Sequence, residues 1–223
     1  MTIRKIRLIF VLSCLLPVTL LSQSAQTKKY QDSESTAILK ELQKTMASYS
    51  TIRIEFTFRS EKNDRFIDEI TGQTRIKGLK YTLKTDQQEV FCDGTTLWNY
   101  LPEQKEVTVS LYDKDDEASL MNPFHLIQHY EKYYQSDFIK EMPERGVLVQ
   151  IIDLTPLKAS SFYRIRLVLD KNKKQILRFI VYEKDGTHYT FTVTKFVVNQ
   201  PLADSLFVFD ASQHEGTEVI DIR

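Results

Sequence analysis

Stretches in which apolar and polar residues alternate dominate the chain from residue 52 onward. The first of them, residues 52–59, reads Ile-Arg-Ile-Glu-Phe-Thr-Phe-Arg, and a period of two places the apolar side chains on one face of a strand. Similar stretches follow at 75–83, 89–92, 97–101, 107–111, 147–154, 162–169, 176–182, 189–198 and 206–209. Turn signals such as Asp93-Gly94 and Asp185-Gly186 connect them, and hairpins follow one another without a crossover helix. The sequence therefore predicts an antiparallel sheet.

A helical period is found in front of the first strand. From Ser35 onward, apolar residues recur on one stripe that consists of Ile38, Leu42, Met46 and Tyr49. Asp32, Ser33 or Ser35 can each cap the start of this helix. The pattern predicts an amphipathic helix whose apolar face packs on another element.

A second, shorter helix is predicted near the middle of the chain. Asn122 suits an N-cap and Pro123 the first helical position, and the pattern runs to about Tyr134. So little helix covers only part of a sheet of about ten or eleven strands. The sheet must therefore curl on itself to hide its apolar face.

The first 25 residues have the parts of a secretory signal peptide. Basic residues at positions 4, 5 and 7 precede an apolar run at 8–21, and small polar residues follow at 22–25. The run is shorter than a membrane span needs, so residues 26–223 are expected as one exported domain. Without the three basic residues, 27 Lys and Arg face 30 Asp and Glu, a net charge of −3. This balance argues against a nucleic-acid binder.

The two cysteines lead to different expectations. Cys14 follows Val-Leu-Ser inside the apolar run, which loosely resembles a lipoprotein cleavage box. Residues 15–21, mostly apolar, come after it and would misplace the cleavage site, so a lipid anchor at Cys14 is kept only as an alternative. Cys92 is then alone in the mature chain, and we expect a small buried hydrophobe that forms no internal disulfide.

Candidate catalytic residues are few. His125 and His129 have the spacing of two metal ligands on one helix face, but no third ligand pattern accompanies them. The carboxylates at 68–69 and 113–117 read as solvated loops, and nucleophile elbows and phosphate loops are not found. We therefore predict that the protein is not an enzyme and holds no metal or cofactor. A hydrolase with two facing carboxylates remains the alternative.

Aromatic residues are concentrated on the predicted strands. The chain has 13 Phe, 11 Tyr and one Trp. They can fill a solid core, or they can line an open apolar pocket on the concave face of a curled sheet, with the helices as its lid. Both arrangements need apolar residues inside, so the period of the sequence does not distinguish them.

Six short motifs occur in an order that resembles the outer-membrane lipoprotein carrier family (LolA-like). The most specific of them is Asp93-Gly-Thr-Thr-Leu-Trp-Asn-Tyr100, followed closely by Pro102. The others are Ile54-Glu-Phe-Thr57, Asn122-Pro-Phe-His-Leu-Ile127, Asp153-Leu-Thr-Pro156, the hairpin through Asp185-Gly186 and the tail from Leu206 to Asp221. The resemblance covers nearly the whole mature chain.

The resemblance implies a mainly β fold with an α lid: an incomplete antiparallel β-barrel closed by helices over an apolar cavity. It implies a monomeric periplasmic carrier that moves acylated lipoproteins from an inner-membrane lipoprotein-releasing transporter to an outer-membrane acceptor. On this basis we expect six residues to form the wall or lid of the cavity: Ile54, Phe56, Phe58, Trp98, Phe124 and Ile127.

One segment departs from the family pattern. Family members often have an Arg-Pro pair after the first hairpin, and the resemblance assigns this arginine to holding the lid. Here the segment reads Lys77-Gly78-Leu79-Lys80-Tyr81, with Gly78 at the arginine position. A sensor of the same fold, which responds to misplaced lipid or lipoprotein, is therefore kept as the alternative function.

Overall fold

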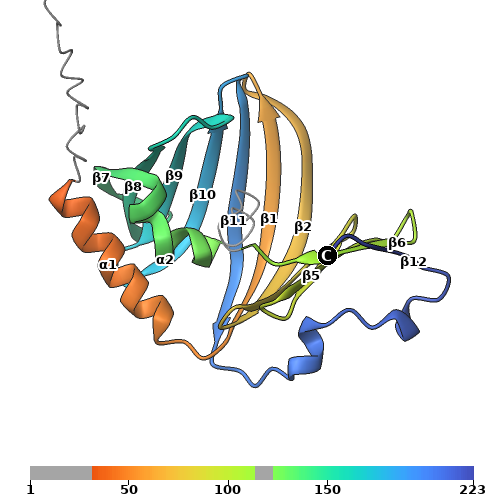
Figure 1. Cartoon of the computed structure of the whole chain (residues 1–223). Coiled ribbons are helices and arrows are strands. Elements are labelled where there is room, and N and C mark those ends of the chain that lie inside the picture. Colours follow the sequence, from red (N-terminus) through yellow and green to blue (C-terminus); the bar gives the residue numbers. More distant parts are fainter. Residues whose placement is uncertain (1–31, 114–122) are drawn as a thin grey trace, which may run out of the picture.

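The computed structural model describes residues 32–113 and 123–223, and most of them belong to one curled sheet (Figure 1). The predicted signal peptide at 1–25 and its boundary lie outside the described residues. The helices are α1 (Ser33–Ala47) and α2 (Pro123–Tyr133), with two short 3-10 turns, η2 (Asp204–Phe207) and η3 (Ala211–Gln213). The strands are β1 (Ile52–Lys62), β2 (Arg65–Lys77), β3 (Lys80–Thr85), β4 (Glu89–Cys92), β5 (Thr96–Leu101), β6 (Glu106–Leu111), β7 (Tyr134–Glu144), β8 (Val147–Pro156), β9 (Phe162–Asp170), β10 (Gln175–Glu183), β11 (Thr187–Val198) and β12 (Glu218–Asp221).

The sheet has twelve strands in the order β12-β6-β5-β4-β3-β2-β1-β11-β10-β9-β8-β7. Neighbouring strands are antiparallel, as predicted, except that β12 pairs with β6 in parallel. The two ends of the sheet do not meet, so the sheet is curled and open. The prediction of a mainly β fold with an incomplete barrel is confirmed, whereas the expected number of about ten or eleven strands was too low.

Three predicted stretches differ from the structure. Residues 75–83 form parts of two strands, because Gly78 has a φ of +60° and reverses the chain between β2 and β3. Residues 206–209 are not a strand: η2 ends at Phe207, which is fully buried. Strand β7 was not predicted at all. It is an edge strand whose second half is largely exposed and contains Pro143, so its apolar alternation is weak.

Helix α1 begins where one of the three predicted caps lies. The Asp32 carboxylate accepts hydrogen bonds from the backbone N–H of Ser35 (3.0 Å) and, on the neighbouring edge strand, of Phe138 (3.0 Å). These bonds hold the pKa of Asp32 below its ordinary value, the bond from Ser35 contributing most. One carboxylate therefore fixes both the start of α1 and its position on β7.

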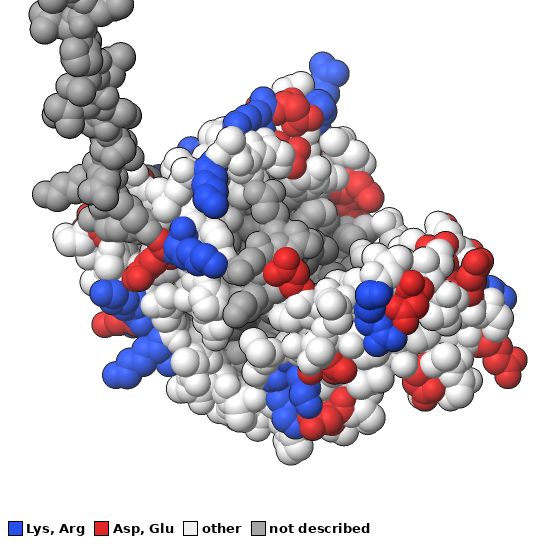
Figure 2. All heavy atoms as spheres, in the orientation of Figure 1, with Lys and Arg blue, Asp and Glu red and all other residues white. Residues whose placement is uncertain are grey.

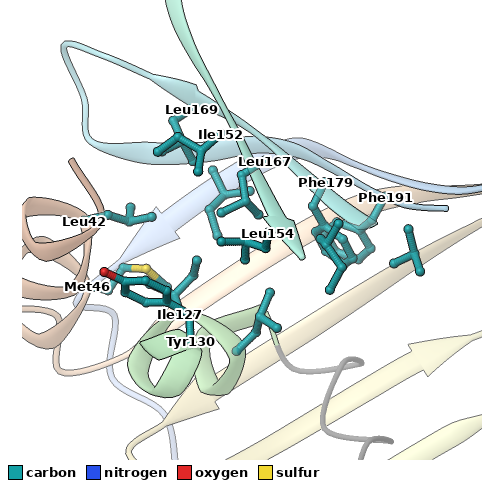
Figure 3. Close-up of a cluster of buried hydrophobic side chains, with 14 of the residues drawn as sticks. Leu42, Met46, Ile127, Tyr130, Ile152, Leu154, Leu167, Leu169, Phe179 and Phe191 are labelled. Atoms are coloured by element: carbon teal, nitrogen blue, oxygen red, sulfur yellow. The ribbon is translucent and has the colours of Figure 1, made fainter. Parts of the chain in front are cut away.

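Both helices lie on the concave side of the sheet and pack on its apolar residues (Figures 1 and 3). The buried residues of α1 are Ser35, Leu39, Leu42 and Met46, so Leu39 takes the place on the buried stripe that the sequence assigned to Ile38. A second, smaller cluster lies on the other face, where Phe209 from the C-terminal segment covers Tyr100 and Val107. Among the described residues, helices long and apolar enough to cross a membrane are not found.

Cys92 is completely buried and free. Burial raises the pKa of its thiol to about 11. The expectation of a small buried hydrophobe at this position is confirmed.

Replacing the cap of α1 tests the link between α1 and β7. Asp32→Ala is expected to lower the free energy of unfolding at pH 7 by about 1 kcal/mol. The native pKa of Asp32 is depressed, so its contribution is complete above the unfolded pKa of about 4 and is lost as the pH falls through the lower native value. The difference between Asp32→Ala and wild type in urea unfolding should therefore shrink from pH 7 to pH 3. Glu34→Ala, in the exposed first turn, is the control, and an equal loss in both variants would contradict the assignment.

Candidate functional site

An apolar pocket of about 400 Å³ opens on the concave face beside the helices. Its volume is within the range of small-ligand sites. The wall consists of side chains from β1, β2, β3, β10 and β11, together with Phe162 at the start of β9: Phe56, Phe58, Ile70, Leu83, Phe179, Val181, Tyr189 and Phe191. Each of these strands contributes side chains of the same parity, so the pocket is a direct consequence of the alternation in the sequence.

Stacked aromatic rings form the floor of the pocket. The ring of Phe56 lies 4.3 Å from that of Phe191, which lies 4.8 Å from that of Phe179. Nearer the end of β1, the rings of Phe58 and Tyr189 are 5.6 Å apart and nearly parallel. Such stacking fixes the rings relative to one another and presents a flat apolar surface.

Gly72 makes room for the central ring of this floor. Gly72 is the cross-strand partner of Phe56, and the ring of Phe56 lies over its Cα. A Cβ at this position would overlap the end of the Phe56 ring and lie 2.9 Å from the carbonyl oxygen of Lys84. Glycine is therefore required here by close approach rather than by its backbone conformation.

The helices cover another part of the concave face. Figure 3 shows Ile127 and Tyr130 of α2 facing Leu42 and Met46 of α1, and the leucines and isoleucines of β8 and β9 beyond them. Ile127 and Tyr130 are completely buried. The side chain of Gln43 also donates a hydrogen bond of 2.9 Å to the carbonyl oxygen of Ile127. Contacts between the helices are thus mainly apolar, with hydrogen bonds from Gln43 of α1 to the backbone carbonyls of Ile127 and Gln128 (3.4 Å) of α2.

The hydroxyl of Tyr130 is the polar group that α2 brings into this interior. Burial raises the pKa of Tyr130 to about 12, with a smaller contribution from Glu131, whose carboxylate accepts its hydrogen bond at 3.3 Å. The phenol is therefore neutral at all physiological pH values. Tyr130 therefore adds no charge to the interior between α2 and the sheet.

The rim of the pocket is polar. Thr85, Gln87 and Gln88 line it from the turn between β3 and β4, and Ser161 and Glu183 line it from the opposite side. Gln88 is held by a hydrogen bond of 2.6 Å to the side chain of Asn99. Apolar walls with a few polar groups at the mouth are typical of a site for an amphiphile.

The structure separates the six residues that the sequence assigned to wall or lid. Phe56 and Phe58 line the pocket. Ile54 is buried next to Met46 of α1 in a gap of about 10 Å³, and Ile127 lies in the interior side of α2. Trp98 lies on the opposite face of the sheet, in the cluster of Tyr100 and Phe209. The side chain of Phe124 lies outside the described part of the structure.

Several lining residues were missed by the sequence analysis. Phe179 and Val181 on β10 and Tyr189 and Phe191 on β11 alternate as regularly as Phe56 and Phe58 do. Their period was visible, but it does not say which strands lie beside the pocket. Glu183 continues the alternation of Phe179 and Val181, but a charged residue gives no apolar signal. The glutamines of the rim lie in a turn, and only the folded chain brings them to the pocket.

Metal and carboxylate sites have little support in the described residues. Within 32–113 and 123–223, groups of three or more His, Cys, Asp or Glu that could hold a metal ion are not found. His129 is exposed on α2, and the side chain of its predicted partner His125 is not described. Among the described residues that line the pocket, Glu183 is the one carboxylate. The two facing carboxylates of a hydrolase are therefore not present among them.

Comparison with known proteins gives a consistent picture. A family model described as "Outer membrane lipoprotein carrier protein LolA" matches residues 47–210, which include β1 to β11. The outer-membrane lipoprotein carrier protein of Haemophilus influenzae is 31% identical over 193 residues, covering 82% of this chain and 86% of its own. That of Pasteurella multocida is 27% identical over 190 residues with the same coverage. Among solved structures, an uncharacterized conserved protein from Thermus thermophilus has a similar fold, with a TM-score of 0.59, 11% identity and coverage of 84% of this chain and 99% of that one.

A methyl group at position 72 tests the floor of the pocket. Gly72→Ala is expected to displace the Phe56 ring and to lower the free energy of unfolding by about 1–3 kcal/mol. In a Phe56→Leu background the same change should cost clearly less, because the smaller side chain leaves room for the methyl group. Urea unfolding of the four proteins measures both costs. Equal costs in the two backgrounds would show that Phe56 does not lie on Gly72.

Proposed function

The chain belongs to the LolA family of outer membrane lipoprotein carrier proteins, and we propose that it carries lipoproteins through the periplasm with an acyl chain in the apolar pocket. The family is one of binding and transport proteins. In this proposal the pocket holds the chain, α1 and α2 are its lid, and the aromatic floor is the main contact surface.

The observation that carries the proposal is the pocket itself: about 400 Å³ of space with an almost entirely apolar wall on one face of a sheet. An acyl chain of a dozen carbons costs roughly 10 kcal/mol to hold in water, since each CH2 group contributes about 0.8 kcal/mol. A carrier must cover the chain and yet release it. Apolar walls without specific polar contacts suit both requirements, because they provide affinity that does not depend on one orientation of the ligand.

The lid of this proposal lacks the polar contact that the family resemblance implied. Gly78 lies in the turn between β2 and β3, and a Cβ there would meet no atom within 4 Å. The neighbouring Lys77 and Lys80 pair with Asp204 of η2, at 2.8 and 3.1 Å, instead of with the helices. We therefore assign lid closure to the apolar contacts of α2 and to the hydrogen bonds from Gln43.

The surface fits a carrier that meets protein partners in an aqueous compartment. Figure 2 shows positive and negative side chains intermixed on this face, without a large region of one sign. A basic stripe of the kind that binds nucleic acid is not seen on it. We propose an inner-membrane lipoprotein-releasing transporter as the loading partner, an outer-membrane acceptor as the receiving partner, and a monomer as the working form.

Purification from the periplasm under native conditions, followed by mass spectrometry of the bound material, tests the function. Lipoproteins with acylated N-termini in the complex would support it. Free lipids together with a membrane-anchored signalling protein would favour the sensor instead. A diacylglyceryl group on Cys14 would overturn the diffusing shuttle, because the chain would then be anchored.

A charge in the wall distinguishes an open pocket from a solid core. Phe58 is half-buried in the pocket, so the carboxylate of Phe58→Glu can stay partly hydrated in the empty protein, and folding should cost about 1–2 kcal/mol while acyl-chain binding is lost. In a solid core the same change would cost more than about 4 kcal/mol. Urea unfolding and a fluorescent fatty-amide binding assay measure the two effects. Phe66→Glu is the control, because Phe66 is 58% exposed at the tip of the same hairpin and should keep both properties.

Salt tests how the lid is held. Apolar contacts are nearly insensitive to ionic strength, whereas exposed ion pairs are screened. The release rate of a bound fluorescent acyl probe is therefore expected to change less than about threefold between 20 and 300 mM NaCl. A many-fold rise would show that charged groups hold α2 closed.

A further inference from the structure

The mouth of the pocket carries one unpaired carboxylate. Glu183 is the only charged residue among the described residues that line the pocket. It is half-buried, and within the described part of the chain its carboxylate makes neither an ion pair nor a side-chain hydrogen bond. A carboxylate at this place can accept hydrogen bonds from a ligand, because donors of the described residues do not occupy it.

The alternation of β10 places this carboxylate on the face of the pocket. Glu183 has the same parity as Phe179 and Val181, which also line the pocket. Its partner across the sheet, Phe162 of β9, lines the pocket too. Glu183 therefore ends, with a charge, a row of side chains that is otherwise apolar.

The charges around Glu183 do not neutralise it. The ammonium of Lys62, on which Glu183 acts, lies 2.6 Å from the carboxylate of Asp185. This hydrogen bond is the main cause of the raised pKa of Lys62, to which Glu183 contributes weakly. Lys184 is exposed on the next position of the turn. Lys62 thus pairs with Asp185 and not with Glu183, which leaves a negative charge at the mouth of the pocket.

Tyr189 lines the same pocket as Glu183. Its ring lines the pocket next to Phe58, and its pKa is raised first by burial and then by Glu183. The carboxylate is therefore close enough to act on a polar group placed among the aromatic rings. A ligand head group at the mouth would experience the same field.

We propose that Glu183 is a specificity-determining residue: it admits acyl chains whose head group is uncharged and carries a hydrogen-bond donor, and it rejects free fatty acids and other anionic lipids. The inference rests on the proposed function and names the ligand class of that pocket. A chain attached to a protein by an amide or ester bond has lost the charge of its carboxylate, and its amide N–H or a glycerol hydroxyl can donate to Glu183. A free fatty acid would place a second carboxylate beside the first.

The discrimination has a physical use for a carrier. Free fatty acids and attached acyl chains have the same apolar tail, so an apolar wall cannot distinguish them. A single repelling charge at the mouth separates the two by disfavouring one of them. The glutamines of the rim remain available as additional donors and acceptors for an ester or amide head group.

Displacement of the uncharged fluorophore N-phenyl-1-naphthylamine from the delipidated protein tests the proposal. Three probes share a twelve-carbon chain: laurate, its glycerol monoester and its ethanolamide, each below its aggregation concentration at pH 8. In wild type, the two uncharged probes should bind roughly ten- to hundredfold more tightly than laurate. In Glu183→Gln the affinity for laurate should rise to within about threefold of the monoester, while the uncharged probes change little.

Glu69→Gln is the matched control, because it removes the same charge from an exposed position on β2 outside the pocket. Equal binding of laurate and monoester to wild type would overturn the inference and leave the proposed function intact. Weaker binding of laurate than of the uncharged probes in both Glu183→Gln and Glu183→Ala would overturn it as well. So would a gain in laurate affinity in Glu69→Gln that equals the gain in Glu183→Gln. Failure of the fluorophore and all three probes to bind wild type would overturn the proposed function, and the inference with it.

Discussion

The apolar concave face of the sheet sets the problem that the rest of the structure solves. Twelve strands about 4.8 Å apart give a sheet roughly 50 Å wide, and β1 with its 11 residues is about 36 Å long. The two helices have 15 and 11 residues, which gives rods of about 22 and 16 Å that are each some 10 Å wide. They cover the part of the face formed by β8 and β9, and curling brings further strands together. What remains uncovered, at β1, β10 and β11, is the pocket.

The alternation of the sequence predicted which residues share a face but not which face is concave. Around β1 the buried aromatic residues lie inside the curl, as Phe56 does. At β5 the aromatic residues Trp98 and Tyr100 lie on the outer face, where Phe209 of the C-terminal segment covers them. Both arrangements have the same period of two. Trp98 was assigned to the cavity on the basis of the family resemblance, yet the covering element is more than 100 residues away in the sequence, beyond what a local pattern can indicate.

Buried apolar contacts hold both the C-terminal segment and the helices, and exposed ion pairs add to them. The C-terminal segment is attached through the buried Phe207 and Phe209 and through Asp204, whose pKa is lowered mainly by its hydrogen bonds to Lys77 and Lys80. The helices are attached through their buried side chains and through an ion pair of 2.8 Å between Glu41 of α1 and Lys174. Such exposed pairs contribute little stability in water. The turn at Gly78 thus directs its two lysines to the C-terminal segment and not to the helices.

The lid and the ligand compete for the same kind of free energy. Among the described side chains of α2, those of Leu126, Ile127 and Tyr130 are buried, and burying a side chain of this size contributes about 1.5–3 kcal/mol. Displacing all three would therefore cost of the order of 5–9 kcal/mol, whereas a twelve-carbon chain gains about 10 kcal/mol on leaving water. The stacked rings of Phe56, Phe179 and Phe191 are held more rigidly, because each is packed on the next and Phe56 lies on a glycine. Under the proposed function, an entering chain would then move α2 before it moves the floor. The near balance of the two free energies would keep binding strong enough to cover the chain and weak enough to reverse.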